Sequence, residues 1–361
     1  MDVSEFAIRV PEDELGELRR RLASTRWPGE WPEPPWAAGS DAATVRRLVN
    51  AWSAFDWRAS EARLNALPQH IATIRGQRVH FLRFRGGEGL PIVLTNGWPS
   101  TFAELIPVAQ RLAAVGHDTI VPSLPGFTFS DPAATAPAAM PTHELWHQLM
   151  IGLGYTRFVA HGGDLGAGIT SRLAAAHPEA VAGIHLMAVA GAADHKDLTA
   201  AEQVYLDAIE AWERDEGAYE HQQQTRPLTL AYGLSDSPAG LLAWIVEKYR
   251  AWSDCGGDLA SRWSDDDILL HASLYWLTNS IGTSFRPYFD YLAHPLGPIE
   301  RISVPTAVAV FPHDLVLPPK EYAERSYEVV RYTRFDRGGH FAPHEEPGLL
   351  ADDILQFVAQ I

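Results

Sequence analysis

One short segment of the chain combines a carboxylate with the glycine spacing that could expose it. Phe158–His161 has the pattern of a buried strand, Gly162–Gly166 follows, and a helical pattern begins at Leu165. Small residues two positions before and two after Asp164 permit the sharp strand-to-helix turn called a nucleophile elbow. The start of a helix also favours a negative charge. The alternative is that Asp164 only caps the helix, because aspartate is common at that position.

Two later segments supply an acid and a histidine in a suggestive order. The apolar run Val308–Phe311 predicts a strand that delivers Asp314, and Arg337–Phe341 puts His340 in a glycine-rich loop after the next strand. The order nucleophile, acid, histidine is that of the α/β-hydrolase triad, in which the acid orients the histidine. We therefore assign Asp314 and His340 these roles. The nearby rivals of His340 are His161, His313 and His344.

Backbone donors for developing negative charge are expected after the strand that ends at Thr95. Asn96–Pro99 follows this strand, and the N–H groups of Trp98 and Leu165 could converge there as an oxyanion hole. Thr101 and Glu104 have the spacing of a capping box for the next helix. Asn-Gly also favours a hairpin turn, but a helical pattern follows instead of a partner strand.

The elements that must position these residues alternate between strand and helix. The predicted strands are 78–85, 91–95, 119–122, 157–160, 183–187, 306–311 and 332–335. The predicted helices are 102–114, 142–153, 165–176, 321–330 and 347–360. Such alternation indicates an α/β fold with a mainly parallel sheet covered by helices on both faces.

The remaining segments divide the chain into three parts. Residues 1–76 form a predicted N-terminal helical arm, with helices at 12–23, 42–52 and 57–67. Residues 77–190 and 300–361 form the predicted catalytic core, and the helical stretch 191–299 forms a predicted lid. Within the arm, Trp27–Trp36 is interrupted by prolines and cannot be helical. Its three tryptophans suggest an extended strap on apolar surface, and a peptide-binding surface is the alternative.

Composition excludes several classes of protein. The 361 residues are 46% hydrophobic and carry a net charge of −16, which argues against nucleic acid or an anionic membrane as partner. The single Cys255 cannot form an intrachain disulfide, and no apolar run is long enough for a membrane span. The N-terminus lacks the pattern of a signal peptide. We expect a cytoplasmic protein, and these features leave homo-oligomerisation open.

With these motifs in place, the sequence resembles the microsomal and juvenile-hormone type of epoxide hydrolases, including their soluble bacterial relatives. The matching stretches span nearly the whole chain: Thr25–Pro28, Asp56–Arg58, Leu67–Gln69, Asn96–Pro99, Pro122–Phe127, Gly162–Asp164, Thr225–Pro227, Asp236–Leu241, Glu247–Lys248, Ala251–Asp254, Arg286–Tyr288, Phe311–Asp314 and Arg337–Phe341. Together they are far more specific than any one motif.

The resemblance implies a two-step reaction on a small-molecule epoxide, without cofactor or metal. Asp164 forms a hydroxyalkyl ester, and His340, supported by Asp314, activates the water that releases a vicinal diol. Two lid tyrosines act as acids toward the epoxide oxygen, and the matching positions are Tyr219 and Tyr288. Other tyrosines compete with Tyr219 for its role: Tyr205, Tyr232, Tyr249 and Tyr275.

The resemblance also carries expectations for the pocket. It implies a cis peptide bond between Trp98 and Pro99. The candidate pocket residues are Trp98, Pro99, Phe127, Leu165 and Phe341.

Two residues depart from the family pattern. Asn96 stands where relatives usually have histidine, which predicts tuned activity, and Leu165 replaces a common tryptophan. A haloalkane dehalogenase would share the fold and the nucleophile, but it typically holds its halide with an aromatic N–H that Leu165 lacks. A non-catalytic binding protein on the same fold is the other alternative, although the triad appears whole.

Overall fold

Short runs rich in valine, isoleucine and leucine form the strands of a nine-stranded mixed sheet. The computed structural model describes residues 1–29, 31–133, 140–192, 195–297, 299 and 301–361. The strands are β1 (Asp2–Glu5), β2 (Gln69–Ile74), β3 (Gln77–Phe84), β4 (Gly89–Thr95), β5 (His117–Pro122), β6 (Phe158–Gly162), β7 (Val181–Leu186), β8 (Ile302–Val310) and β9 (Tyr327–Arg334). Their spatial order is β1-β2-β3-β5-β4-β6-β7-β8-β9.

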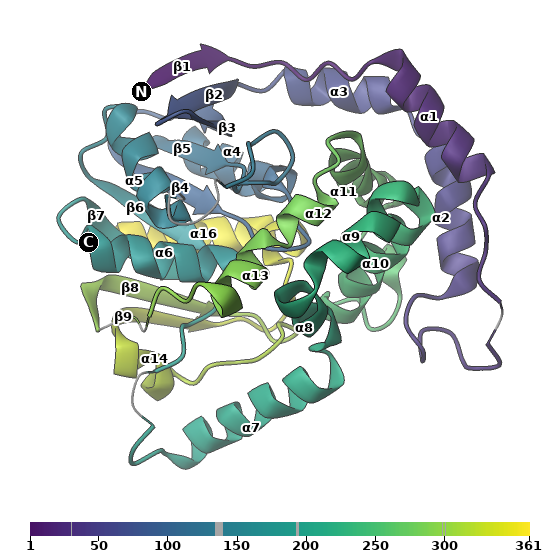
Figure 1. Ribbon diagram of the computed structural model, residues 1–361. Helices are drawn as coiled ribbons and strands as arrows, with labels where there is room; N and C mark the ends of the chain where they lie inside the picture. Colours follow the sequence, from purple (N-terminus) through teal and green to yellow (C-terminus); the bar gives the residue numbers. More distant parts are fainter. Residues whose placement is uncertain (30, 134–139, 193–194, 298, 300) are drawn as a thin grey trace.

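The sheet is parallel where the candidate site lies and antiparallel at its N-terminal edge. Strands β5, β4, β6, β7, β8 and β9 pair in parallel, whereas β1, β2, β3 and β5 pair antiparallel. Helices cover both faces (Figure 1). These helices are α4 (Ile106–Ala114), α5 (Thr142–Gly152), α6 (Leu165–Ala176), α14 (Lys320–Ser326), α15 (Ala342–Glu345) and α16 (Pro347–Val358). The expected α/β fold with a parallel core is confirmed.

A block of helices between β7 and β8 forms the lid, and the N-terminal arm packs against it (Figure 1). The lid helices are α7 (Ala200–Asp215), α8 (Ala218–Thr225), α9 (Pro227–Asp236), α10 (Pro238–Trp252), α11 (Asp265–Leu277), α12 (Ile281–Ser284) and α13 (Arg286–Ala293), with a 3-10 turn, η2, at Leu259–Ser261. The arm helices are α1 (Glu12–Ala23), α2 (Ala42–Ala54) and α3 (Trp57–Asn65). The buried indole of Trp52 donates a 2.9 Å hydrogen bond to Ser273 Oγ of the lid. The arm therefore supports the lid.

Three regions of the chain differ from the sequence prediction. The predicted helix 321–330 ends at Ser326, because Tyr327 is fully buried and begins strand β9 beside β8. The predicted helix 102–114 begins with a 3-10 turn, η1 (Phe102–Leu105). Residues 1–76 also contribute β1 and β2, two short strands that the sequence analysis missed.

Only part of the proline-rich stretch 27–36 lies on apolar surface as expected. Trp27 and Trp36 pack against the core with half-buried rings, and arginine side chains lie over both rings. Trp31 is 75% exposed, so the expectation that all three tryptophans lie on apolar surface is wrong. Glu30, within this stretch, lies outside the described residues.

Candidate active site

Asp164 occupies a strained turn between strand β6 and helix α6. Its backbone has φ 51° and ψ −127°, and its side chain makes no capping hydrogen bond. The turn is tight, because a Cβ on Gly162 would collide with the Gly166 carbonyl. A positive φ at a non-glycine residue has a cost that surrounding structure must offset, and such residues cluster at functional sites. The geometry is that of an elbow and does not support the capping alternative.

The loop after β4 approaches the Asp164 carboxylate directly. The backbone N–H of Trp98 donates a 2.9 Å hydrogen bond to Asp164 Oδ1. Gly97 permits this approach, since a Cβ there would overlap the carboxylate. The Trp98–Pro99 peptide bond is cis, as expected. Helix η1 follows this loop, so the Asn-Gly hairpin does not form. The second expected donor, the N–H of Leu165, stays a prediction.

His340 lies between the two acidic residues that the sequence paired with it. Its Nδ1 is 2.7 Å from Asp314 Oδ1, and its Nε2 is 3.8 Å from Asp164 Oδ2. Burial would lower the pKa of His340, but the charges of Asp314 and Asp164 outweigh burial and raise this pKa to about 9. Imidazolium is therefore favoured at neutral pH in the enzyme without substrate.

The three rival histidines contact other groups. His161 Nδ1 lies 3.0 Å from His185 Nδ1, under the elbow on β6. His313 Nε2 lies 3.1 Å from Asp254 Oδ1, and His344 Nε2 lies 3.0 Å from the Arg262 carbonyl oxygen. The structure therefore places His340, and not these three, between Asp314 and Asp164.

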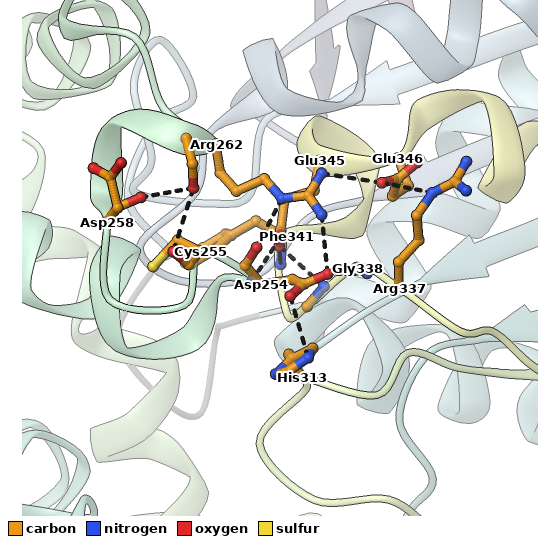
Figure 2. Close-up of polar contacts among 12 residues, drawn as sticks. Asp254, Cys255, Asp258, Arg262, His313, Arg337, Gly338, Phe341, Glu345 and Glu346 are labelled. Carbon is orange, nitrogen blue, oxygen red and sulfur yellow. Dashed lines mark hydrogen bonds and ion pairs between the residues drawn. The ribbon is translucent and has the colours of Figure 1, made fainter.

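A lid aspartate holds the loop that contains His340. Asp254 follows helix α10, and its Oδ2 accepts a 2.9 Å hydrogen bond from the Gly338 N–H (Figure 2). The same carboxylate binds Arg262 at 2.9 Å and His313 at 3.1 Å. The His340 N–H donates to the Trp252 carbonyl at 2.9 Å. The lid thus restrains both sides of the His340 loop.

Glu345, the last residue of helix α15, and Glu346, which follows it, complete this network (Figure 2). Glu345 accepts hydrogen bonds from the N–H groups of Asp254 at 2.7 Å and of Gly339 and Phe341 at 3.2 Å. Glu346 forms ion pairs with Arg262 at 3.1 Å and Arg337 at 3.0 Å. Burial raises the pKa of Glu345 to about 7. The position of His340 therefore depends on charged groups from the lid and the core together.

Tyr219 and Tyr288 come from lid helices α8 and α13 and meet in an aromatic cluster. The Tyr219 ring stacks on Trp98 at 5.2 Å, and the Tyr288 ring meets Trp98 edge-on at 6.2 Å. The two phenol rings are 6.1 Å apart. Burial, followed by the negative charge of Asp164, holds the pKa of each phenol well above its usual value. Both phenols therefore stay protonated and can donate hydrogen bonds.

The rival tyrosines have other surroundings. The Tyr249 hydroxyl donates to the Pro99 carbonyl at 3.3 Å, and the Tyr275 hydroxyl donates to the Ser100 carbonyl at 2.9 Å. Tyr205 packs edge-on against Tyr322, and Tyr232 is 82% exposed. By contrast, the buried Tyr288 hydroxyl has no well-formed hydrogen bond among the described residues.

A small cavity lies beside Asp164 and His340. Its other lining residues are Thr95, Asn96, Gly97, Trp98, Ser100, Glu104, Leu105, His161, Gly163, Met187, Phe341 and Pro343. Trp98 and Phe341 are thus the pocket candidates found at this cavity. Pro99, Phe127 and Leu165 do not line it, and their contact with substrate stays a prediction.

Glu104 is the cavity residue whose role the sequence analysis misjudged. The expected capping box does not form, because Thr101 Oγ1 accepts from the Ala103 N–H at 3.3 Å and meets His271 Nδ1 at 3.0 Å. Glu104 is instead 6% exposed in the cavity wall. Burial raises the pKa of Glu104 to about 7. Its place in the chain, eight residues after Asn96, gave no sign of this position.

Comparisons with known proteins agree with the fold and the motifs. A model of the epoxide hydrolase N terminus matches residues 3–105, and a model of the α/β hydrolase fold matches residues 91–347. A protein of Stigmatella aurantiaca, provisionally named an epoxide hydrolase, is 38% identical to this chain. The match covers 99% of this chain and 85% of that protein.

Solved structures of epoxide hydrolases are similar over almost the entire chain. An enantioselective mutant of the Aspergillus niger enzyme is 30% identical, with a TM-score of 0.89 and coverage of 100% of this chain and 97% of that one. The juvenile hormone epoxide hydrolase of Bombyx mori is 29% identical, with a TM-score of 0.87 and coverage of 99% and 94%. The chain belongs to the epoxide hydrolases of the α/β hydrolase fold.

Proposed function

We propose that this epoxide hydrolase opens a small-molecule epoxide through a covalent ester on Asp164. The observation that carries the proposal is the position of the Asp164 carboxylate, with Oδ1 bonded to the Trp98 N–H and Oδ2 near His340. Oδ2 attacks an epoxide carbon, and the carbon–oxygen bond of the ring breaks. Tyr219 and Tyr288 donate hydrogen bonds to the epoxide oxygen, which ends as a hydroxyl group.

Ester formation changes the electrostatics around His340. The charge of Asp164 is one cause of the raised pKa of His340, and esterification removes that charge. The pKa of His340 therefore falls, the imidazolium releases its proton to solvent, and the neutral imidazole becomes available as general base. Asp314 continues to orient the ring through the 2.7 Å contact with Nδ1.

The second step regenerates the Asp164 carboxylate, and His340 regains a proton from solvent once that charge is restored. His340 takes one proton from a water molecule, and the resulting hydroxide attacks Cγ of the Asp164 ester. Negative charge then develops on Oδ1, where the Trp98 N–H, and the Leu165 N–H if it converges there, stabilise it. Collapse of this intermediate releases the diol, with a proton from His340, and the second proton of the water restores the tyrosine.

The competing function is dehalogenation with the same nucleophile. Leu165 has no side-chain N–H for a halide, whereas the paired phenols suit an oxygen leaving group that needs a proton.

Among the helices that the structure describes, none is both long and apolar enough to cross a membrane. The cytoplasmic location and homo-oligomerisation stay proposals from composition.

A parallel assay distinguishes the two chemistries. The purified protein is incubated with terminal, styrene-type and cyclic epoxides, and with haloalkanes of matched carbon skeleton. We expect diol formation from at least one epoxide class and no halide release above the rate of the Asp164→Ala variant. Halide release without diol formation would replace this proposal with the dehalogenase.

A further inference from the structure

Side chains with metal-binding atoms meet on the sheet face covered by α5 and α6. Glu144 and His147 lie three residues apart on α5, and His177 is the residue that ends α6. Ligand atoms of these three residues all lie within 4.8 Å of one another. Because residues three apart share a helix face, α5 presents two ligands together toward His177.

The three side chains of the cluster are in direct contact with one another, and small changes of side-chain rotamer would direct their ligand atoms toward one ion. His177 Nε2 lies 3.0 Å from Glu144 Oε1, and the rings of His147 and His177 stack with centroids 3.5 Å apart. The other ring nitrogen of His177 lies 3.6 Å from Glu179 Oε1. A carboxylate on the second nitrogen is the common outer partner of a metal-binding histidine.

The cluster is open to ions yet held by two helices. The side chains of Glu144 and His177 are 33% and 17% exposed. The local structure thus supplies two imidazoles and a carboxylate without a change of fold.

We propose that Glu144, His147 and His177 form a binding site for a divalent first-row transition-metal ion, represented by Zn²⁺. Two imidazoles and one carboxylate match the ligand preferences of Zn²⁺, and water would complete a tetrahedral shell. This site departs from the expectation, drawn from the sequence, that the chain takes no metal.

The ion would have a structural role. Asp164 lies at the start of α6 and His177 at its end, and a 12-residue helix is about 18 Å long. The metal would join the end of α6 to the first turns of α5 and leave catalysis unchanged. This proposal does not depend on the proposed reaction of Asp164.

The test uses the full chain after removal of metal with a chelator. Zn²⁺ binding is measured by competition with a chromophoric chelator, and Tm is recorded with and without the ion. We expect one Zn²⁺ per chain and a Tm increase of about 2–5 °C at a free concentration roughly 100-fold above Kd. Mg²⁺, which prefers oxygen ligands, should leave Tm unchanged.

Variants locate the ion. The double variant His147→Ala/His177→Ala should lose both the high-affinity Zn²⁺ and the Tm increase, and Glu144→Gln should weaken binding at least about tenfold, or about 1.4 kcal/mol. His294→Ala, which removes an exposed histidine outside the cluster, is the matched control and should bind like the parent. The proposal is overturned if the double variant binds Zn²⁺ with parent affinity, or if the parent does not bind at about 1 mM.

Discussion

The two sides of the proposed active site are held by different forces. His340 belongs to a loop whose backbone N–H groups donate hydrogen bonds to the carboxyl groups of Asp254 and Glu345. Tyr219 and Tyr288 are held by aromatic packing on Trp98. Hydrogen bonds fix the orientation of the His340 loop, whereas packing holds the two phenol rings and leaves the Tyr288 hydroxyl without a well-formed hydrogen bond among the described residues. The base side of the site, formed by the His340 loop, therefore depends on the orientation of that loop. The acid side, formed by Tyr219 and Tyr288, depends on hydroxyl groups that can donate hydrogen bonds.

The largest expected effect comes from the acid side. Removal of both hydroxyls in Tyr219→Phe/Tyr288→Phe should nearly abolish ester formation, because the epoxide oxygen would leave as an unassisted alkoxide. Each single variant should slow it roughly 10- to 150-fold, since a hydrogen bond to a charged group contributes about 1.5–3 kcal/mol. Single-turnover quench experiments measure this step.

Tyr232→Phe, which changes an exposed lid tyrosine, is the control for the tyrosine variants. If the double variant forms the ester at nearly the parent rate, both assignments are wrong. If only Tyr219→Phe is without effect, another lid tyrosine is the second acid.

The second-largest effect concerns how the rate of ester hydrolysis by His340 depends on pH. The pKa of His340 is about 9 in the free enzyme and should be lower in the ester, which lacks the charge of Asp164. Ester hydrolysis should then slow roughly tenfold for each pH unit below the pKa of the ester form, because the neutral imidazole is lost. A pH jump after ester formation measures this rate. Hydrolysis independent of pH from about 5 to 9 would exclude His340 as the base.

A smaller effect is expected when the lid releases the His340 loop. Asp254→Asn weakens the contacts of this side chain with Gly338 and Arg262, so ester hydrolysis should slow about tenfold, equivalent to about 1.4 kcal/mol. Ester formation should change much less. Asp258→Asn is the matched control, because this exposed residue caps the nearby turn without contacting the loop. Equal slowing of both steps would indicate a general loss of structure.

The smallest effect is expected at Asn96. Its Nδ2 donates to the Gly97 carbonyl at 2.8 Å, and its Oδ1 is buried without a partner among the described residues. Asn96→His introduces the histidine that the resemblance implies for this position, in a loop that already positions the Trp98 N–H. Steady-state activity should change by less than about tenfold, or about 1.4 kcal/mol. A larger change would mean that Asn96 also affects the reacting groups.

The sequence predicted those features that depend on local pattern. The elbow at Asp164 follows from glycines within two residues, and the parallel core follows from the alternation of strand and helix. The predicted helix boundary near Tyr327 is wrong because a helical pattern overlaps strand β9 there, and only pairing with β8 decides between the two.

Contacts between residues that are far apart in the sequence could not be predicted from local sequence patterns. Glu345 meets Asp254 across 91 positions of the chain, and no spacing rule connects them. Glu104 has the spacing of a cap, but tertiary packing turns it into the cavity wall. The roles of Tyr219 and Tyr288 are predicted from the family resemblance alone, because a lone lid tyrosine has no distinguishing pattern.

The intact mass of His340→Gln after incubation with an epoxide tests the central claim most directly. The variant retains Asp164 and both phenols but lacks the base, so the ester should form and persist. We predict a mass increase equal to that of the substrate, located on Asp164 by peptide mapping. Rapid diol production by Asp164→Ala, together with no adduct on His340→Gln, would contradict the account.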